Sequence, residues 1–136
     1  MSITLRFRPN ISHGWRVWKE AVEVAGIPFR ISDARKFSYG RRQNLCWERE
    51  TSNPRDPNAI KVIGLYKSWF FNRSAHIGYV PAEDAEIIAR RDFSEFLPRL
   101  RSIWLGDQTA LAIVVSFDIL ETKKPRTKRV PVQPVI

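Results

Sequence analysis

The chain has 136 residues, 43% of them hydrophobic, and carries a formal net charge of +9 with a pI near 10.3. This length fits one domain with a substantial core, and five tryptophans argue against disorder. The single cysteine, Cys46, excludes an internal disulfide, and two histidines are too few for a zinc cluster. The positive charge indicates either a polyanionic partner such as nucleic acid or a basic, solvated surface, and charge alone does not decide between them.

Residues 1–43 predict two strands and a loop. Apolar and polar residues alternate over 3–7, and Pro9 ends this strand. A second strand is predicted over about 20–30, with Gly26 permitting a bulge. A short helix is the alternative there, because the apolar residues before Gly26 also recur at helical spacing. Segment 31–43 is polar and basic, which predicts a loop with room for one helical turn.

The chain from residue 44 onward predicts most of the sheet structure. Strands are expected at about 44–50, 59–66 and 75–80. A link over 67–74 separates the last two, and a helix is expected over about 82–91, with acids at its start and arginines at its end. A hairpin of 99–105 with 109–120 follows, and the tail from 121 is basic. Together these elements predict a mostly β (α+β) fold, a small OB-like β-barrel of about six strands with one or two helices.

The polar turn between the strands at 44–50 and 59–66 is longer than a strand reversal needs. It contains Asn53-Pro54 and Asp56-Pro57, which restrict the backbone and bond nearby amides. Two residues suffice to reverse a strand, so the surplus predicts a site. Asp56 could accept a hydrogen bond from a sugar hydroxyl, or it could only tie the turn together. Arg49 and Glu50 are interpreted as a structural ion pair.

Three stretches in this order and spacing resemble the HIRAN domain family. They are Ala25-Gly26-Ile27-Pro28-Phe29-Arg30, the run from Arg49-Glu50 through Asn53-Pro54 to Val62, and Ile77-Gly78-Tyr79-Val80-Pro81 at the start of a helix. The resemblance covers about 24–120. It suggests three regions: an N-terminal extension with the first strand (1–23), a HIRAN-like β-barrel (24–120) and a basic, proline-containing tail (121–136).

The resemblance implies a fold and a ligand. In fork-remodelling helicases this OB-like domain captures the 3′ end of single-stranded DNA with aromatic residues, an acid that meets the 3′-hydroxyl and a basic residue at the start of the helix. Phe29 matches an aromatic stacker, and Asp56 matches the acid. Three residues depart from that pattern: Arg30 and Arg55 replace aromatics, and Ala82 replaces the basic residue. A phosphate, an internal segment of the strand or RNA is therefore the alternative ligand.

We therefore expect a nucleic-acid-binding module that grips single-stranded DNA, with its 3′ end as one candidate for the part bound. The residues expected to bind nucleic acid are Phe29, Arg30, Arg41, Arg42, Arg55, Asp56 and Lys61. No constellation typical of catalysis, metal binding or a cofactor is visible, so no enzyme is expected. Without a signal peptide or a membrane-length apolar run, we expect a cytoplasmic protein of prokaryotic or phage origin.

The alternative function is a non-catalytic interaction subunit of a larger nucleoprotein complex, in mobile-element, phage or defence machinery. The residues expected to contact that partner are Trp69, Phe70, Phe71, Lys123 and Lys124. Three consecutive aromatics cannot all face one core in an extended segment. The loop that carries them therefore either folds over a satellite core or exposes an apolar patch.

Overall fold

The computed structural model of the chain describes residues 2–107 and 112–123. The elements of this structure, in chain order, are β1 (Ile3–Arg6), β2 (Trp15–Glu23), the 3₁₀ helix η1 (Ile27–Arg30), α1 (Ile31–Ser38), β3 (Arg41–Arg49), β4 (Ile60–Ser68), β5 (Phe71–Tyr79), α2 (Ala82–Arg91), the 3₁₀ helix η2 (Phe93–Glu95), β6 (Phe96–Leu105) and β7 (Ile113–Thr122).

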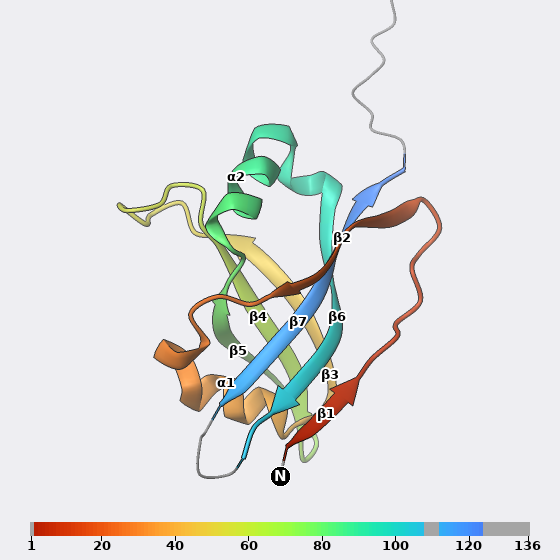
Figure 1. Cartoon of the computed structure of the whole chain (residues 1–136), viewed down its shortest axis with the longest axis vertical. Helices are drawn as coiled ribbons and strands as arrows, with labels where there is room; N and C mark the ends of the chain where they lie inside the picture. The colour runs from red at the N-terminus through yellow and green to blue at the C-terminus, as the bar shows by residue number, and fades with distance from the viewer. Residues whose placement is uncertain (1, 108–111, 124–136) are drawn as a thin grey trace, which may run out of the picture.

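The strands form two antiparallel sheets (Figure 1). One has four strands in the order β1-β6-β7-β2, and the other has three in the order β3-β4-β5. An isolated bridge joins the sheets, because the backbones of Ala25 and Tyr79 exchange hydrogen bonds of 2.8 and 2.9 Å. Within the described ranges, hydrogen bonding does not close the sheets into a barrel. The mostly β fold is confirmed, and the OB-like barrel stays a prediction compatible with these sheets.

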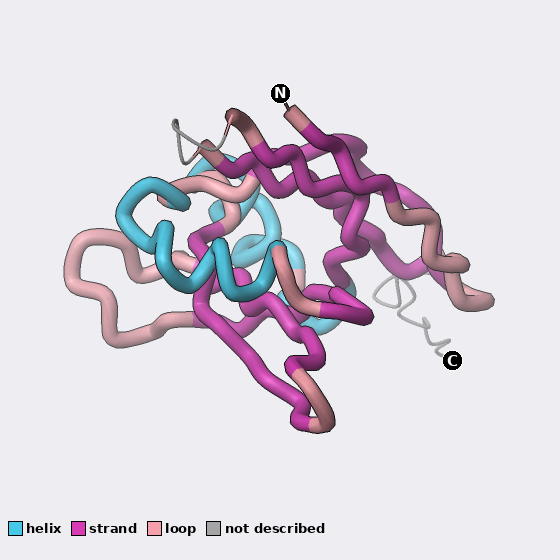
Figure 2. Tube along the Cα trace, turned by 90° about the horizontal axis from the view of Figure 1, so that it is seen from below, coloured by secondary structure: helices cyan, strands magenta, loops and turns pink. Residues whose placement is uncertain are grey.

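The core lies between the sheets and is closed by the helices. Figure 2 shows the sheets on opposite sides of the molecule, and in Figure 1 α1 and α2 lie at opposite ends. The four-stranded sheet contributes Ile103 and Phe117, the three-stranded sheet contributes Val62 and Ile77, and all four side chains are fully buried. Burying such side chains is the main force that holds the two sheets together.

Helix α1 packs against β4 because β4 has a glycine at the contact. Phe37 of α1 is fully buried, and a Cβ atom built at Gly64 would lie 2.5 Å from its ring. Any larger residue at position 64 would push the helix away from the sheet. The ring of Phe37 also meets that of Tyr66 edge to face, at 6.3 Å between centroids.

The structure corrects the predicted strand over 20–30 and the predicted loop over 31–43. Strand β2 already begins at Trp15 and ends at Glu23, so the short-helix alternative for this region was wrong. Gly26 then adopts a left-handed conformation (φ 81°), and the chain enters η1, where Pro28 lies in the first turn. Proline lacks a backbone N–H and suits the start of a helix.

Residues 31–38 form the two-turn helix α1, although a loop with room for only one helical turn was expected over 31–43. Ala34, Phe37 and Ser38 are buried at helical spacing, which gives the helix one inward face. The charged residues between them obscured this pattern in the sequence. Residues 39–40 connect this helix to β3, which starts at Arg41 and takes up the last three residues of the predicted loop.

The predicted link over 67–74 was also wrong, because β4 and β5 continue almost to each other. Ser68 pairs with Phe71, so only Trp69 and Phe70 form the turn. Trp69 has a positive φ of 59°, which a two-residue hairpin turn requires and which glycine or asparagine usually provides. The helix over 82–91 and the last hairpin are confirmed, although residues 108–111 of that hairpin lie outside the described ranges.

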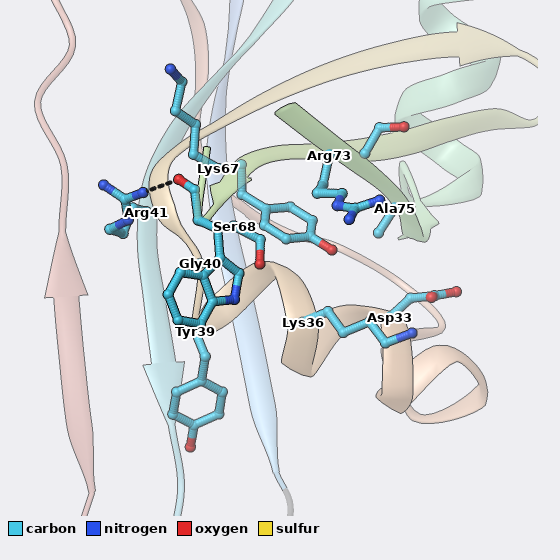
Figure 3. Close-up of a pocket in the computed structure, with 12 residues that line it drawn as sticks. Asp33, Lys36, Tyr39, Gly40, Arg41, Lys67, Ser68, Arg73 and Ala75 are labelled. Carbon is cyan, nitrogen blue, oxygen red and sulfur yellow. Dashed lines mark hydrogen bonds between the residues drawn. The ribbon is translucent and has the colours of Figure 1, made fainter. Parts of the chain in front are cut away.

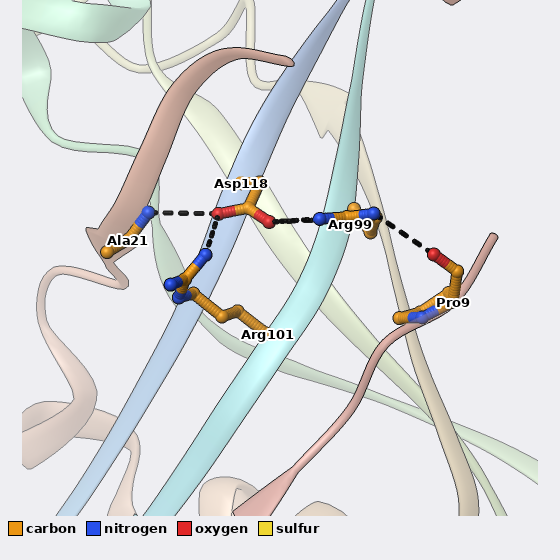
Figure 4. A network of polar contacts seen from close by, with 5 residues as sticks. All are labelled: Pro9, Ala21, Arg99, Arg101 and Asp118. Atoms are coloured by element: carbon orange, nitrogen blue, oxygen red, sulfur yellow. Dashed lines mark hydrogen bonds and ion pairs between the residues drawn. The ribbon is translucent and has the colours of Figure 1, made fainter. Parts of the chain in front are cut away.

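A buried carboxylate fixes the irregular centre of the four-stranded sheet (Figure 4). Asp118 of β7 accepts hydrogen bonds from the Ala21 amide at 3.0 Å, from Arg99 at 2.9 and 3.2 Å, and from Arg101 at 3.1 Å. Ala21 has a positive φ of 55° within a register shift of β2. Burial alone would raise the pKa of Asp118, but the bonds from Ala21, Arg99 and Arg101 outweigh it and lower the pKa.

Candidate nucleic-acid interface

The segment after Gly26 presents an aromatic ring and a guanidinium at the surface. Phe29 of η1 is 93% exposed. The next residue, Arg30, has its guanidinium carbon 5.9 Å from the centre of the Tyr79 ring at the end of β5. A cation over an aromatic face is an attractive arrangement. The Phe29 ring is therefore accessible from solvent, and Arg30 is partly accessible beside it.

The turn between β3 and β4 is held by its own side chains. The Asn53 Oδ1 atom accepts hydrogen bonds from the backbone amides of Arg55 at 2.9 Å and Asp56 at 3.2 Å. The Asp56 Oδ1 atom accepts one from the Asn58 amide at 3.0 Å. The Asx bond predicted for Asp56 is therefore present. Within the described ranges its Oδ2 atom accepts no hydrogen bond, so the carboxylate can both tie the turn and bind a hydroxyl.

A hydrogen-bonded chain connects this turn to the ring under Arg30. The Tyr79 hydroxyl donates to Glu50 Oε1 at 2.9 Å, and the Asn53 side-chain amide donates to the same oxygen at 3.1 Å. The bond from Tyr79 lowers the pKa of Glu50; burial opposes that shift, whereas the Asn53 bond and the nearby positive charges support it. Glu50 thus stays ionised and fixes Asn53 relative to Tyr79.

A histidine lies beside the same tyrosine. The rings of His76 and Tyr79 meet edge to face at 4.9 Å between centroids, and His76 Nε2 lies 2.9 Å from the Gly78 carbonyl oxygen. Burial lowers the pKa of His76, and the charge of Arg30 lowers it further. At neutral pH the imidazole is therefore uncharged, and Arg30 supplies the positive charge here.

The contacts of Glu50 and Lys61 differ from those expected from the sequence. Among the described residues Glu50 bonds Tyr79 and Asn53, and no ion pair joins it to Arg49. Lys61, predicted to bind nucleic acid, pairs instead with Glu48 at 3.0 Å on the neighbouring strand. Its side chain is 26% exposed, and its backbone lies directly opposite Tyr79 on β5, because Lys61 and Tyr79 are register partners.

Arg41 and Arg42 lie far from the Asn-Pro turn. They begin β3, whereas the turn follows its end, so roughly 25 Å of extended strand separates them. Arg41 donates a hydrogen bond to the backbone carbonyl of Trp69, which places it with the β4–β5 hairpin. Arg42 is exposed and has a positive φ of 54°. The structure therefore separates the seven predicted nucleic-acid residues into two groups.

The aromatic residues predicted to contact a partner form an exposed hairpin tip. Trp69, Phe70 and Phe71 are 78%, 91% and 60% exposed, so the expected alternative of a satellite core was wrong. Lys123 lies at the end of β7, where its amide bonds Gly14, and Figure 1 shows this end away from the β4–β5 hairpin. Lys124 lies outside the described residues.

Other chemistry is sparse in the part of the chain that the structure describes. It contains no group of three or more histidine, cysteine, aspartate or glutamate side chains that could hold a metal ion. Its helices include none that is long and apolar enough to cross a membrane. Cys46 is half-buried in β3, and burial raises the pKa of its thiol.

The family model of the HIRAN domain matches residues 19–93, which include η1, the Asn-Pro turn and the start of α2. The chain belongs to the HIRAN domain family. HIRAN domains are DNA-binding modules. No curated protein matches the chain. A crystal structure of a protein from Lactobacillus plantarum matches it with a TM-score of 0.45 and 17% identity, over 89% of this chain and 99% of that chain.

Within the HIRAN match, sequence reasoning missed three residues that organise the surface. Glu50 was assigned to an ion pair, His76 was interpreted as an ordinary strand residue, and Tyr79 was noted only as part of the Gly-Tyr-x-Pro motif. The Gly-Tyr-x-Pro motif was the signal that could have drawn attention to Tyr79. In the structure this tyrosine pairs with Ala25, and its ring lies beside Arg30 of η1.

Proposed function

We propose that this HIRAN protein binds single-stranded DNA, taking the 3′ end of the strand at the surface between η1 and the Asn-Pro turn. The observation that carries the proposal is the connected set Arg30, Tyr79, Glu50 and Asn53, with contacts of 5.9, 2.9 and 3.1 Å. This set holds an exposed aromatic ring and an available carboxylate in a fixed relation. The proposed module acts by binding, without catalysis and without a cofactor.

Each side chain has a distinct proposed role. Phe29 stacks on a base, a contact that contributes about 1–3 kcal/mol per base in single-strand binders. Arg30 and Arg55 bind phosphates, which Arg30 can do while it remains over the Tyr79 ring. Asp56 accepts a hydrogen bond from the terminal 3′-hydroxyl through Oδ2. Lys61 adds positive charge beside the site while it stays paired with Glu48.

An acid in a basic surface favours a hydroxyl over a phosphate. A carboxylate accepts a hydrogen bond from a sugar hydroxyl, whereas it repels a terminal phosphate. Arg55 adjoins Asp56 in the turn, and its exposed side chain would attract the phosphate that Asp56 repels. The balance between Arg55 and Asp56 thus sets whether a free 3′-hydroxyl is preferred.

The test is the fluorescence anisotropy of one oligonucleotide prepared with a 3′-hydroxyl or a 3′-phosphate, with RNA of the same sequence as a third ligand. We expect the hydroxyl form to bind more tightly and Asp56→Asn to remove the difference. Asparagine can still accept the Asn58 amide bond, so the turn is preserved. Glu86→Gln, on the exposed face of α2, is the matched control for the change in charge. Equal binding of both ends by the wild-type protein would overturn the proposed end recognition.

A further inference from the structure

A basic and aromatic groove lies between α1 and the β4–β5 hairpin (Figure 3). Its volume is about 940 Å³. Figure 3 shows Asp33 and Lys36 of α1 on one side and Arg73 and Ala75 of β5 on the other. No residue proposed above to hold the 3′ end lines this groove. We call it the hairpin groove.

The charged lining of the hairpin groove is strongly biased to positive. Four cations line it, with Asp33 as the acid among its lining residues; they are Lys36, Arg41, Lys67 and Arg73. None of the four forms an ion pair with another described residue. Unpaired cations that surround a groove attract an anion, and four of them suit a polymer with repeated charges better than a single ion.

The same groove presents three aromatic side chains. Tyr39 and Trp69, 67% and 78% exposed, line it together with the half-buried Tyr66. The Tyr66 ring is held edge to face against the buried Phe37. The Trp69 backbone carbonyl accepts a hydrogen bond from Arg41, which ties the hairpin tip to the start of β3.

Positive charge combined with accessible rings distinguishes nucleic acid from a protein partner. Surfaces that bind single strands pair a cationic track for the backbone with rings on which bases stack. The centre of a protein-docking patch is instead depleted of charged residues other than arginine, whereas this groove also carries Lys36 and Lys67. Phe70, the most exposed ring of the hairpin at 91%, does not line the groove, so the groove is not simply the apolar tip.

Helix α1, which follows η1 directly, links the surface proposed for the 3′ end to the hairpin groove. Arg30 lies one helical turn before Asp33, and α1 runs from one site to the other beside β5. Along β5, Tyr79 and Arg73 are roughly 20 Å apart at the usual rise of an extended strand. A stacked strand advances about 3.4 Å per nucleotide, so some six nucleotides would span this distance.

We infer that the hairpin groove is a second binding site for the same strand, one that holds an internal segment of single-stranded DNA several nucleotides from its 3′ end. The inference rests on the proposed function, both for single-stranded DNA as the ligand and for the site that takes its 3′ end. Tyr39 and Trp69 stack bases, while Lys36, Arg41, Lys67 and Arg73 bind the backbone phosphates. The site takes any base sequence, because its contacts are to rings and phosphates.

Oligonucleotide length provides the test, with 4-nucleotide and 12-nucleotide single-stranded DNA in anisotropy titrations. The groove variants are Trp69→Asn, which keeps the left-handed turn accessible, and Arg73→Gln. For the 12-mer we expect Trp69→Asn to weaken binding about 5- to 100-fold, the usual loss for a stacking ring. Arg73→Gln should reduce the salt slope by about 0.7. Neither should change the affinity of the 4-mer, which fills only the end site.

Phe70→Ala is the matched control, because Phe70 is a neighbouring exposed ring outside the groove. It should leave 12-mer binding unchanged. The inference is overturned if Trp69→Asn and Phe70→Ala change the 12-mer affinity by the same factor. It is also overturned if both variants leave the DNA affinity unchanged and alter only the sedimentation of the protein, a result that would indicate a protein-docking hairpin. If the wild-type protein binds neither oligonucleotide at low salt, the proposed function itself fails. If the wild-type protein binds both and the groove variants bind the 12-mer as tightly as it does, only the inference fails.

Discussion

The Tyr79 hydroxyl donates a hydrogen bond to Glu50, and through it the end of β5 is tied to the end of β3. The guanidinium of Arg30 lies over the Tyr79 ring. From the turn, the Asn53 side-chain amide donates a second hydrogen bond to Glu50. The 3₁₀ helix η1 and the Asn-Pro turn, which are 20 residues or more apart in the chain, are thus both held by contacts to Tyr79 and Glu50. Such preorganisation reduces the ordering cost of ligand binding.

Tyr79→Phe tests this support while keeping the ring beneath Arg30. Removal of the hydroxyl leaves Glu50 with one bond fewer, so we expect a loss of about 0.5–1.5 kcal/mol in the free energy of unfolding. We also expect weaker binding of single-stranded DNA, since Glu50, which holds Asn53, is no longer tied to Tyr79. Urea denaturation and anisotropy measure the two effects. Tyr39→Phe, whose hydroxyl is exposed, should change neither the stability nor the 4-mer affinity.

The ionisation of Glu50 should make stability depend on pH. Because the hydrogen bond from Tyr79 lowers the folded-state pKa below the ordinary value of 4.5, the stabilisation is complete above pH 4.5. It is lost as the pH falls through the lowered pKa. Thermal denaturation of wild type and Glu50→Gln should therefore differ by a constant amount above pH 5 and converge in more acid solution. A difference that grows on acidification would contradict this assignment.

The charge of Arg30 should be detectable at His76. Burial lowers the pKa of His76 below 6.5, and Arg30 lowers it further. Arg30→Gln should therefore raise the pKa, measured from the ring proton shifts by NMR. Arg35→Gln, which removes an exposed cation of α1, is the control and should leave it unchanged. A bound phosphate should act in the same direction as Arg30→Gln, since it favours the protonated imidazole.

Asp118→Ala should destabilise the four-stranded sheet. It would leave the Ala21 amide without its acceptor and deprive Arg99 and Arg101 of their buried counter-charge (Figure 4). Breaking such a pair costs about 3 kcal/mol. Chemical denaturation monitored by tryptophan fluorescence measures the change. Asp33→Ala, an acid of α1 outside this network, should cost less than about 0.5 kcal/mol.

Gly64→Ala should be destabilising despite adding only one methyl group. The new Cβ atom would lie 2.5 Å from the buried Phe37 ring, so the helix must shift. Overpacking of this kind costs about 1–3 kcal/mol. The double variant Gly64→Ala with Phe37→Leu should recover part of the loss, because leucine is smaller. No recovery in a denaturation experiment would show that the clash lies elsewhere.

The sequence predicted elements whose signal is local. The helix at Ala82–Arg91 has acids at its start and arginines at its end, and the alternation in β1 is visible without tertiary information. Helix α1 was missed because its inward face comprises few residues among many charges. The tight hairpin was missed because Trp69 occupies a left-handed position that sequence rules assign to glycine or asparagine.

The sequence motifs of the candidate site could be found from the sequence, whereas the contacts between its residues could not. Phe29 and Asp56 follow from the resemblance to the HIRAN family, and the exposed aromatic hairpin was one of two stated alternatives. The grouping of Arg41 with Trp69 depends on strand register, which no short motif encodes. The same holds for Glu50, whose partners come from the turn and from β5.

The most direct measurement is an NMR titration of backbone amides with a 12-nucleotide single-stranded DNA that ends in a 3′-hydroxyl. The account predicts that shift changes concentrate on η1, on the turn around Asp56 and at Tyr79, with a second group along the hairpin groove at Arg73 and Trp69. Changes confined to the four-stranded sheet, for example around Arg6 and Arg101, or to the basic tail would contradict it.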